Sequence, residues 1–404
     1  MEFSDFLKEL LGIGDDFELS KIETNETEKQ INIYLDYMPK FYNIGDDKFP
    51  VYDHAPARKW QHLNWFEYKC FLHCSLPRYV NAARKVTTIE IPFAPKSRSY
   101  THKFSQQIIL FLQTVRVQNT VAKLLNTTSY IVRSIMEDAV EKALLNRGFI
   151  TDFKNVSLDE KAYKPGHEYA TILIDSDKEC VLNLVEGRKE KSVKALFFEL
   201  NEQEKQPQIE IVNIDMWKPF MNVMTELSPY AMLVHDKFHL VKKLSEAIDK
   251  TRKNEIKENP ILTKQKYAVM KNQHNRTENQ HRIFQEMTKI NLKTSQAWAM
   301  RENFKDVFAT NHWSDKLQHY KVWLEETPKM NLKFINEVVE TFKRHTQGIQ
   351  NAIITDTTSA KHENLNGKIQ SVLAKARGFL NFNRFKINVM FYFGNLNLTP
   401  LKFY

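Results

Sequence analysis

The chain has 404 residues, of which 42% are hydrophobic and 26% are charged, and its formal net charge is +9. That length and composition predict two or three globular domains, and exclude a small disulfide-stapled scaffold. Three cysteines, Cys70, Cys74 and Cys180, cannot form a disulfide framework, which indicates a reducing compartment. The sequence has no apolar run that could span a bilayer, and its acidic, amphipathic start is unlike a secretory signal. We therefore expect a cytoplasmic protein with no membrane partner.

Charge is distributed unevenly along the chain. Residues 1–78 and 149–240 carry more acidic than basic side chains, whereas residues 79–148 and 241–404 are basic. Basic surfaces attract phosphate backbones, and clustered carboxylates suggest a place where divalent cations bind. A single charged run is more often a solvated surface, but the alternation of blocks favours a nucleic-acid partner.

Residues 1–98 are expected to form a small α+β module, because residues 39–95 mix prolines, aromatic residues and short β-like runs. Cys70, His73 and Cys74, with His62 upstream, could suggest zinc. A structural zinc site normally needs two ligand pairs set well apart on the chain. We therefore expect no zinc here.

Residues 99–150 contain a helix-turn-helix pattern. The run "QNTVAKLL" is followed by "NTTS", whose small polar residues predict a turn and a helix N-cap, and a long amphipathic helix comes next. Ser129, Tyr130 and Arg133 would lie on the exposed early turns of that helix, where DNA bases and phosphates are reached. A plain helical hairpin is the alternative, and the basic charge of this block favours DNA binding.

From residue 151 the pattern changes to strands. Three β-like runs, "NVSLDEKA", "EYATILIDSD" and "CVLNLVEGR", precede a helix, a strand ending at Asp215, a second helix, a strand over 230–235 and a basic helix. This order predicts an α/β fold, with a ribonuclease H-like core whose first part spans 151–257. Residues 258–355 would be a helical insertion, and residues 356–404 would supply the last helix of the core and a tail.

Two of the predicted strands carry an aspartate at their expected ends, Asp159 and Asp215. Neighbouring strand ends of an open α/β sheet converge on one crevice, where paired carboxylates can hold Mg²⁺. Asp175 also ends a predicted strand and is the main rival for the first position. We rank it second because Asp159 lies on the first strand of the meander.

A third carboxylate could come from Glu363, which begins a predicted helix and is the only acid among residues 361–404. By itself it could equally be a surface partner of Lys361 or Lys368. Asp236 and His239 lie at a strand-to-helix corner in "LVHDKFHLVKKL". On local evidence Asp236 could simply cap the helix while His239 packs in its first turn.

The helical insertion contains Trp298, Trp313 and Trp323. Aromatic side chains there could stack on bases splayed near a cut site, although tryptophans at helical spacing are more often core residues.

Four ordered motifs resemble the DDE-type transposases of bacterial insertion sequences, in particular the ISL-three-like group related to the Mutator-like transposases. They are "LDEKAYKPGHEYATILID", "IDMWKPF", "HDKFHLVKKLSEAIDKTRK" and "SAKHENLNGKIQ...ARGFLNF". The resemblance implies that Asp159, Asp215 and Glu363 bind two Mg²⁺ or Mn²⁺ ions. It also implies accessory active-site roles for Asp236 and His239, because "DKFH" matches the DxxH box of the family.

The resemblance further implies a DNA transposase. Such a protein binds the terminal inverted repeats of its element, cleaves DNA, and joins the exposed 3′-hydroxyl to target DNA. It would act as a homo-oligomer on double-stranded DNA, in association with the nucleoid. Relatives carry cysteine pairs of a zinc ribbon near the N-terminus, where this chain has "DYMPKFYNIG" and "PRYVNAARK", so a metal-free module is expected. The alternative function is a catalytically inactive, transposase-derived DNA-binding protein or regulator.

Overall fold

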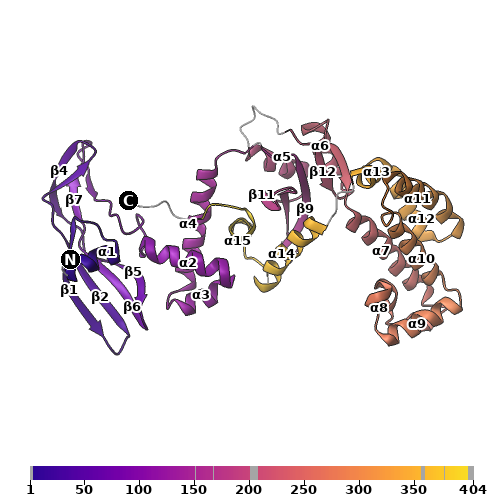
Figure 1. The fold of residues 1–404 in the computed structure, drawn as a ribbon, viewed down its shortest axis with the longest axis horizontal. Helices are drawn as coiled ribbons and strands as arrows, with labels where there is room; N and C mark the ends of the chain where they lie inside the picture. Colours follow the sequence, from indigo (N-terminus) through magenta and orange to yellow (C-terminus); the bar gives the residue numbers. More distant parts are fainter. Residues whose placement is uncertain are drawn as a thin grey trace. The chain divides into compact units, whose positions relative to one another are not determined.

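The computed structural model describes residues 3–150, 152–166, 168–200, 208–355, 360–376 and 378–398 (Figure 1). The chain divides into two compact units, Met1–Arg147 with Leu396–Tyr404, and Gly148–Asn395. Mixed sheets and helices make the protein an α/β chain. No helix in the described ranges is long and apolar enough to cross a membrane.

The first unit begins with helix α1 (Phe3–Leu11) and two four-stranded sheets. One sheet has the order β1 (Phe17–Asn25), β2 (Gln30–Tyr37), β6 (Tyr68–Cys74) and β5 (Arg58–Trp65). The other has the order β3 (Phe41–Ile44), β4 (Asp47–His54), β7 (Pro77–Val80) and β8 (Val86–Thr88). Side chains alternate between the faces of a strand, so one face of the first sheet supplies the core, which includes Ile33, Trp60 and Leu72.

Cys70 and Cys74 belong to this same core as free thiols. Burial raises the pKa of each thiol to about 12, which keeps both sulfurs protonated at neutral pH. A thiol must lose its proton to bind zinc, so these two side chains act as small apolar core residues in this environment.

Three helices follow: α2 (His102–Val115), α3 (Gln118–Leu124) and α4 (Ser129–Arg147). The Thr101 hydroxyl caps α2 by accepting a hydrogen bond from the Phe104 amide, and the Thr128 hydroxyl accepts one from the Ile131 amide at the start of α4. The buried side of α4 is formed by Val132, Ser134, Ile135, Met136, Val140 and Ala143.

The far C-terminal segment also belongs to the first unit. A cavity of about 130 Å³ is lined by residues of α2 and α4 together with Asn397 and Leu398. Leu398 is buried, with 6% of its surface exposed. Residues 396–398 therefore add an apolar contact to the helices of the first unit, although they lie at the opposite end of the sequence.

The second unit contains a five-stranded sheet with the order β11-β10-β9-β12-β13. Its strands are β9 (Asn155–Lys164), β10 (Glu168–Asp175), β11 (Cys180–Glu186), β12 (Ile211–Ile214) and β13 (Met232–His235). The first three strands pair antiparallel, whereas β12 pairs parallel with both β9 and β13. The chain thus forms a meander and then adds two strands on its other side through helical connections.

One face of this sheet is covered by α5 (Glu190–Phe198) and α6 (Lys218–Leu227). Val156 and Leu158 of β9 pack there with Val193 of α5 and Val223 of α6. Near the C-terminus come α14 (Ala360–Ala376) and α15 (Phe382–Phe393). Phe385 of α15 stacks on Tyr163 of β9, with ring centroids 5.8 Å apart, and this contact fixes α15 to the meander.

The residues predicted to form a helical insertion, 258–355, pack around the long helix α7 (Lys237–Glu255), which precedes them. The α-helices of this segment are α8 (Lys266–Met270), α9 (Glu278–Lys289), α10 (Lys293–Asp306), α11 (Trp313–Glu326), α12 (Lys333–Arg344) and α13 (Thr346–Thr355). Helix α13 returns to the sheet, where the Asn351 amide donates a 2.8 Å hydrogen bond to the carbonyl of Leu233 on β13. This bond anchors the exit of the insertion to an edge strand.

The three tryptophans of the insertion have different surroundings. Trp323 is buried and donates a 2.9 Å hydrogen bond to the Met300 carbonyl, and Trp298 packs against Phe284. Trp313 is 51% exposed at the start of α11. Trp298 and Trp323 are therefore core residues, and Trp313 alone of the three has an open surface.

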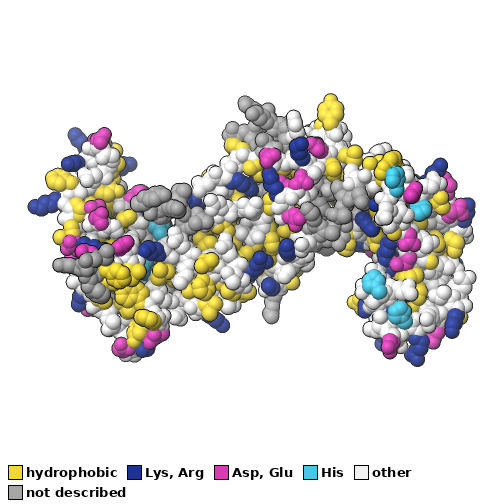
Figure 2. Space-filling view, in the orientation of Figure 1, with side chains coloured by type: hydrophobic (Ala, Val, Ile, Leu, Met, Phe, Trp, Pro, Cys, Tyr) yellow, Lys and Arg dark blue, Asp and Glu magenta, His cyan; other side chains and the backbone are white. Residues whose placement is uncertain are grey.

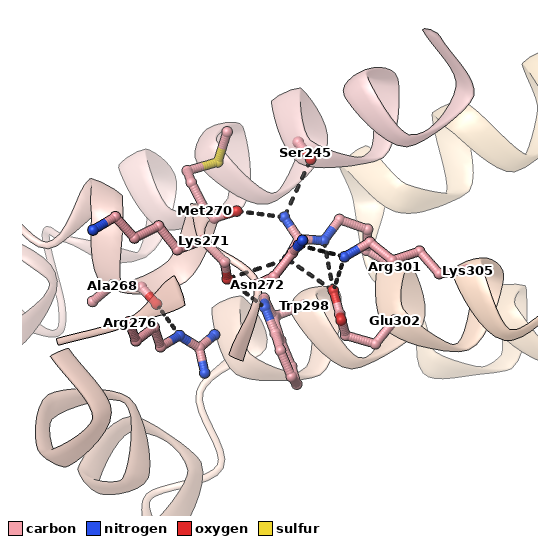
Figure 3. Close-up of polar contacts among 10 residues, drawn as sticks. All are labelled: Ser245, Ala268, Met270, Lys271, Asn272, Arg276, Trp298, Arg301, Glu302 and Lys305. Carbon is pink, nitrogen blue, oxygen red and sulfur yellow. Dashed lines mark hydrogen bonds and ion pairs between the residues drawn. The ribbon is translucent and has the colours of Figure 1, made fainter. Parts of the chain in front are cut away.

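A buried arginine ties the first part of the insertion together (Figure 3). Arg301 is 1% exposed and donates hydrogen bonds to the Ser245 hydroxyl and to the Met270 carbonyl, at 3.2 and 2.7 Å. It also pairs with Glu302 at 2.8 Å, which in turn accepts a 2.7 Å hydrogen bond from Lys305. Because α7, α8 and α10 all supply partners, one side chain joins three helices.

Candidate active site

Three aspartates are associated with three neighbouring strands of the central sheet: Asp159 lies within β9, and Asp215 and Asp236 directly follow β12 and β13. Asn213 of β12 pairs with Ser157 of β9, and Ile214 pairs with His235 of β13. This register, continued by one or two residues, would bring Asp215 level with Asp159 on one side and with Asp236 on the other. Side chains at matched positions of parallel strands share a face of the sheet. We therefore expect the three carboxylates to lie in one row across β9, β12 and β13.

Asp159 is buried, with 8% of its surface exposed. One carboxylate oxygen accepts a 2.8 Å hydrogen bond from the Glu160 amide, and the other lies 2.8 Å from the ammonium of Lys161. The half-buried carboxylate of Asp215 accepts a 2.6 Å hydrogen bond from the Met216 amide. Each carboxylate is thus oriented by its own backbone, and Asp159 already holds one positive charge.

Asp159 was expected to close its strand, and the structure corrects this expectation. Strand β9 continues to Lys164, five residues further, because its antiparallel partner β10 still pairs with it there. Only the parallel partner ends at this level, since β12 stops at Ile214. Asp159 is therefore at the end of the parallel pairing and in the middle of its strand.

The rival residue Asp175 lies elsewhere. It pairs with Val156, whose side chain faces the core under α5 and α6, so it belongs to the opposite face from Asp159. Its carboxylate is 1% exposed and accepts 2.9 Å hydrogen bonds from the amides of Asp177 and Lys178. These contacts fit a residue that shapes the turn between β10 and β11.

Asp236 is the N-cap of α7. One of its carboxylate oxygens accepts a 2.8 Å hydrogen bond from the Phe238 amide. The other lies 3.7 Å from Nδ1 of His239, beyond a normal hydrogen bond but within ion-pair range. The capping role is therefore present, and the carboxylate also faces an imidazole that is 22% exposed.

Glu363 lies in the first turn of α14, and its side chain is outside the residues whose side chains are described. Whether it joins the aspartate row stays a prediction. Within the described part of the chain, no group of three or more His, Cys, Asp or Glu side chains is placed to hold a metal ion. That statement does not include Glu363.

Sequence reasoning missed two histidines beside Asp215. The ring of His235, at the end of β13, packs edge to face on the ring of His345, with centroids 5.2 Å apart. Burial lowers the pKa of His235 to about 4, and burial also lowers the pKa of His345, while the carboxylate of Asp215 opposes both shifts. A Cβ on Gly348 would lie 2.4 Å from the His235 ring, so that helix position needs glycine. The sequence signal that could have identified this pair was His235, because it directly precedes the candidate site residue Asp236.

The predicted DNA-binding residues begin α4. Tyr130 is 66% exposed, and the guanidinium of Arg133 lies over its ring at 5.5 Å while approaching Glu137 at 3.9 Å. The hydroxyl of Ser129 donates a 2.7 Å hydrogen bond to the Asn119 side chain of α3. Ser129 therefore ties the two helices together, and Tyr130 is more open than Arg133, whose side chain is 30% exposed.

Basic side chains do not collect in one block on the visible surface. Figure 2 shows Lys and Arg side chains scattered among acidic and uncharged ones in both units. On the face that Figure 2 shows, the basic side chains therefore do not form one continuous patch.

Comparisons with known proteins agree with this architecture. A family model for DDE transposases of the ISL3 type, described as "Transposase", matches residues 156–389. The match covers more than half of the chain and all of the central sheet except the first residue of β9, so the chain belongs to this family of transposases.

Curated relatives extend the similarity over most of the chain. The chain is similar to the transposase for insertion sequence element IS1557 of Mycobacterium tuberculosis strain ATCC 25618 / H37Rv, with 23% identity over 357 residues, covering 80% of this chain and 79% of the relative. It is also similar to the transposase for insertion sequence element IS1001 of Bordetella parapertussis, with 22% identity over 342 residues, covering 82% and 84%.

Proposed function

We propose that the second unit is a ribonuclease H-like catalytic core that cleaves DNA at the ends of an insertion sequence and transfers the exposed strand to a target. The observation that carries this proposal is the parallel pairing of Asn213 with Ser157, because the same register continued by two residues would align Asp215 with Asp159. The strand order β11-β10-β9-β12-β13 supports it, since three antiparallel strands followed by two parallel ones is the arrangement expected of such a core.

The residues of the row fit a divalent cation. Mg²⁺ and Mn²⁺ prefer hard oxygen ligands, and Asp159 and Asp215 present carboxylates from adjacent strands. Lys161 already places an ammonium 2.8 Å from Asp159, which indicates that this carboxylate attracts positive charge in the folded chain. Asp159, Asp215 and Glu363 would hold two ions. Bound there, such ions supply charge that activates an attacking hydroxyl and stabilises the leaving oxygen.

The protein side chains around the row have separate tasks. Hydrogen bonds from the amides of Glu160 and Met216 hold the two carboxylates in fixed directions. Lys161, which pairs with Asp159, would turn toward a DNA phosphate when that carboxylate is otherwise neutralised. Asp236 and His239, at the end of the row, would orient groups near the reacting phosphate.

DNA recognition is assigned to the first unit. Helices α3 and α4 would form a helix-turn-helix, with Tyr130 and Arg133 reaching the terminal inverted repeats and Ser129 holding the helix pair in shape. The protein would work as a homo-oligomer that brings two element ends together on double-stranded DNA.

The test compares cleavage with binding on the same preparations. Asp159→Asn, Asp215→Asn and Glu363→Gln should each abolish nicking of a duplex carrying the end of the element in Mg²⁺, while affinity for that duplex stays close to wild type. Asp175→Asn is the matched control and should keep its cleavage per folded molecule. Loss of cleavage in Asp175→Asn with full activity in Asp159→Asn would overturn the assignment. A wild-type protein that binds the ends without nicking them would instead be a transposase-derived regulator.

A further inference from the structure

We propose that Arg188 is a positioning residue for the metal site, because it binds the two backbone segments that carry Asp159 and Asp215 and sets the spacing between them. This inference rests on the proposed function, since it concerns how the two carboxylates stay arranged for divalent cations. Arg188 lies in the connection between β11 and α5, outside the four motifs that resemble the transposase family.

The side chain of Arg188 reaches the residue that follows Asp159. One guanidinium nitrogen lies 3.3 and 3.5 Å from the two carboxylate oxygens of Glu160. The amide of Glu160 is the group that donates a 2.8 Å hydrogen bond to the Asp159 carboxylate. Consecutive residues of a strand point to opposite faces, so Arg188 meets Glu160 on the face opposite to Asp159. Arg188 therefore acts on Asp159 through the backbone of Glu160.

Arg188 also holds the segment that follows Asp215. The indole N–H of Trp217 donates a 3.4 Å hydrogen bond to the Arg188 carbonyl, and the guanidinium lies over the indole ring at 5.3 Å. Between Asp215 and Trp217 is Met216, whose amide donates a 2.6 Å hydrogen bond to the Asp215 carboxylate. One residue thus joins both segments whose amides orient the candidate carboxylates.

The position of Arg188 is itself fixed by β10. The N–H of Gly187 donates a 2.7 Å hydrogen bond to the Tyr169 carbonyl, and the Gly187 carbonyl accepts a 2.7 Å hydrogen bond from the Thr171 hydroxyl. Gly187 has a φ of 90°, and a Cβ there would lie 2.7 Å from Oγ of Ser192, so this position requires glycine. The Arg188 guanidinium lies over the Tyr169 ring at 4.3 Å. Arg188 is therefore anchored through both its backbone and its side chain.

Such an anchor matters because the pairing of the two strands stops short of the carboxylates. The last residue of β12 that pairs with β9 is Asn213, opposite Ser157. Two further residues on each segment lead to Asp215 and Asp159. Side chains that bind a ligand together need their geometry held to within about 0.5 Å. The contacts of Arg188 lie beyond the last paired residues and supply that constraint.

The charge of Arg188 separates a positioning role from an electrostatic one. A positive charge near a cation site opposes binding of the cation by Coulomb repulsion. Removal of that charge should therefore tighten metal binding if Arg188 acts only through its field. Removal of a contact that orients the metal-binding side chains has the opposite effect, and typically weakens metal binding about 10- to 100-fold. The two roles predict changes of opposite sign.

The test uses the full-length chain and measures Mn²⁺ binding without DNA by electron paramagnetic resonance, together with the Mg²⁺ dependence of nicking. The variants are Arg188→Met and Trp217→Ala, and the second changes no charge. The Arg188 side chain is 40% exposed, so Arg188→Met should fold. Lys154→Met is the matched control, because Lys154 pairs with Glu210 at 2.8 Å just before the starts of β9 and β12, at the other ends of the same two strands.

We expect Arg188→Met and Trp217→Ala each to weaken Mn²⁺ binding per folded molecule by about 10- to 100-fold. The Mg²⁺ concentration for half-maximal nicking should rise by the same factor, while the maximal rate at saturating Mg²⁺ stays close to wild type. Lys154→Met should match wild type in both measurements.

Asp159→Asn distinguishes the two ways in which the expectation can fail. If Asp159→Asn loses Mn²⁺ binding while Arg188→Met binds Mn²⁺ as tightly as wild type or more tightly, the positioning role alone is overturned. Equal weakening in Lys154→Met, or a lower maximal rate with an unchanged half-saturating Mg²⁺ concentration, would also overturn that role. If wild type binds Mn²⁺ no better than Asp159→Asn does, the metal site of the proposed function fails, and the positioning role fails with it.

Discussion

The hydroxyl of Thr127 donates a 2.8 Å hydrogen bond to the side-chain oxygen of Gln61, which joins the turn between α3 and α4 to strand β5. The amide of the same glutamine reaches the Asn126 carbonyl, and the nearby Asn64 amide donates a 3.1 Å hydrogen bond to the Leu125 carbonyl. Three consecutive residues before α4 are thus held by two side chains of the β-sheet. The N-terminal module therefore fixes the position from which α4 begins.

Replacing Gln61 by Ala should leave the Thr127 hydroxyl and the Asn126 carbonyl without these partners. The expected loss is about 1 to 3 kcal/mol of unfolding free energy, together with faster hydrogen exchange in peptides covering residues 125–130. Gln30→Ala is the control, since Gln30 lies on the same sheet face away from the turn. Equal effects of the two substitutions would show that the turn does not depend on β5.

Asp236 can be tested for a role beyond capping. Asp236→Ser keeps a side-chain oxygen for the Phe238 amide but removes the negative charge, whereas Asp236→Ala removes both. We expect the Ala variant to lose about 0.5 to 2 kcal/mol of stability, the Ser variant to lose little, and both to lose DNA cleavage. Thermal unfolding and strand transfer on the same preparations measure the two effects. If Asp236→Ser cleaves DNA at the wild-type rate, the role of Asp236 is restricted to capping α7.

The buried guanidinium of Arg301 should be essential to the helical insertion. Arg301→Met removes its bonds to Ser245, Met270 and Glu302, although Glu302 keeps its contact with Lys305 (Figure 3). Leaving a buried acceptor such as the Met270 carbonyl without its donor costs about 1 to 3 kcal/mol, so the melting temperature should fall by several degrees. The control is Arg282→Met, an exposed arginine of α9. Similar melting of both variants would contradict a structural role for the buried network.

His62 predicts a pH dependence of stability. Its ring is 1% exposed, Nδ1 lies 2.8 Å from the Thr101 hydroxyl, and burial lowers its pKa to about 4. The unfolded chain takes up the proton near pH 6.5 and the folded chain does not, so the contribution is complete above pH 6.5 and is lost as the pH falls toward 4. As the pH falls through that window, the unfolding free energy of wild type should decrease by about 1.4 kcal/mol per pH unit relative to that of His62→Gln.

Denaturant unfolding between pH 7 and 4.5 measures this difference. His54→Gln provides the control, because His54 is exposed on β4. A constant difference between wild type and His62→Gln across the window would show that His62 titrates alike in both states.

The sequence by itself determined the order of the elements. The apolar strand before Asp215, the polar turn "NTTS" before α4, and the helix that contains Glu363 could all be predicted, because each depends on neighbours a few residues away. The four motifs also pointed to a transposase family, which the family match confirms. Asp159, Asp215 and Asp236 could also be selected from the sequence, because each follows a short apolar run.

Only the tertiary structure decided which of those residues lie together. Parallel pairing of β12 with β9 brings the segment that ends at Asp215 toward Asp159, although they are far apart in the sequence. Antiparallel pairing of β10 with β9 turns Asp175 to the other face, and the return of the helices to the sheet brings His345 against His235. In the first unit, strand pairing likewise brings Lys21, Tyr34, His73 and Lys59 into one row from four different strands. A register shift of one residue would send every side chain of a strand to the opposite face, and local spacing carries no record of that choice.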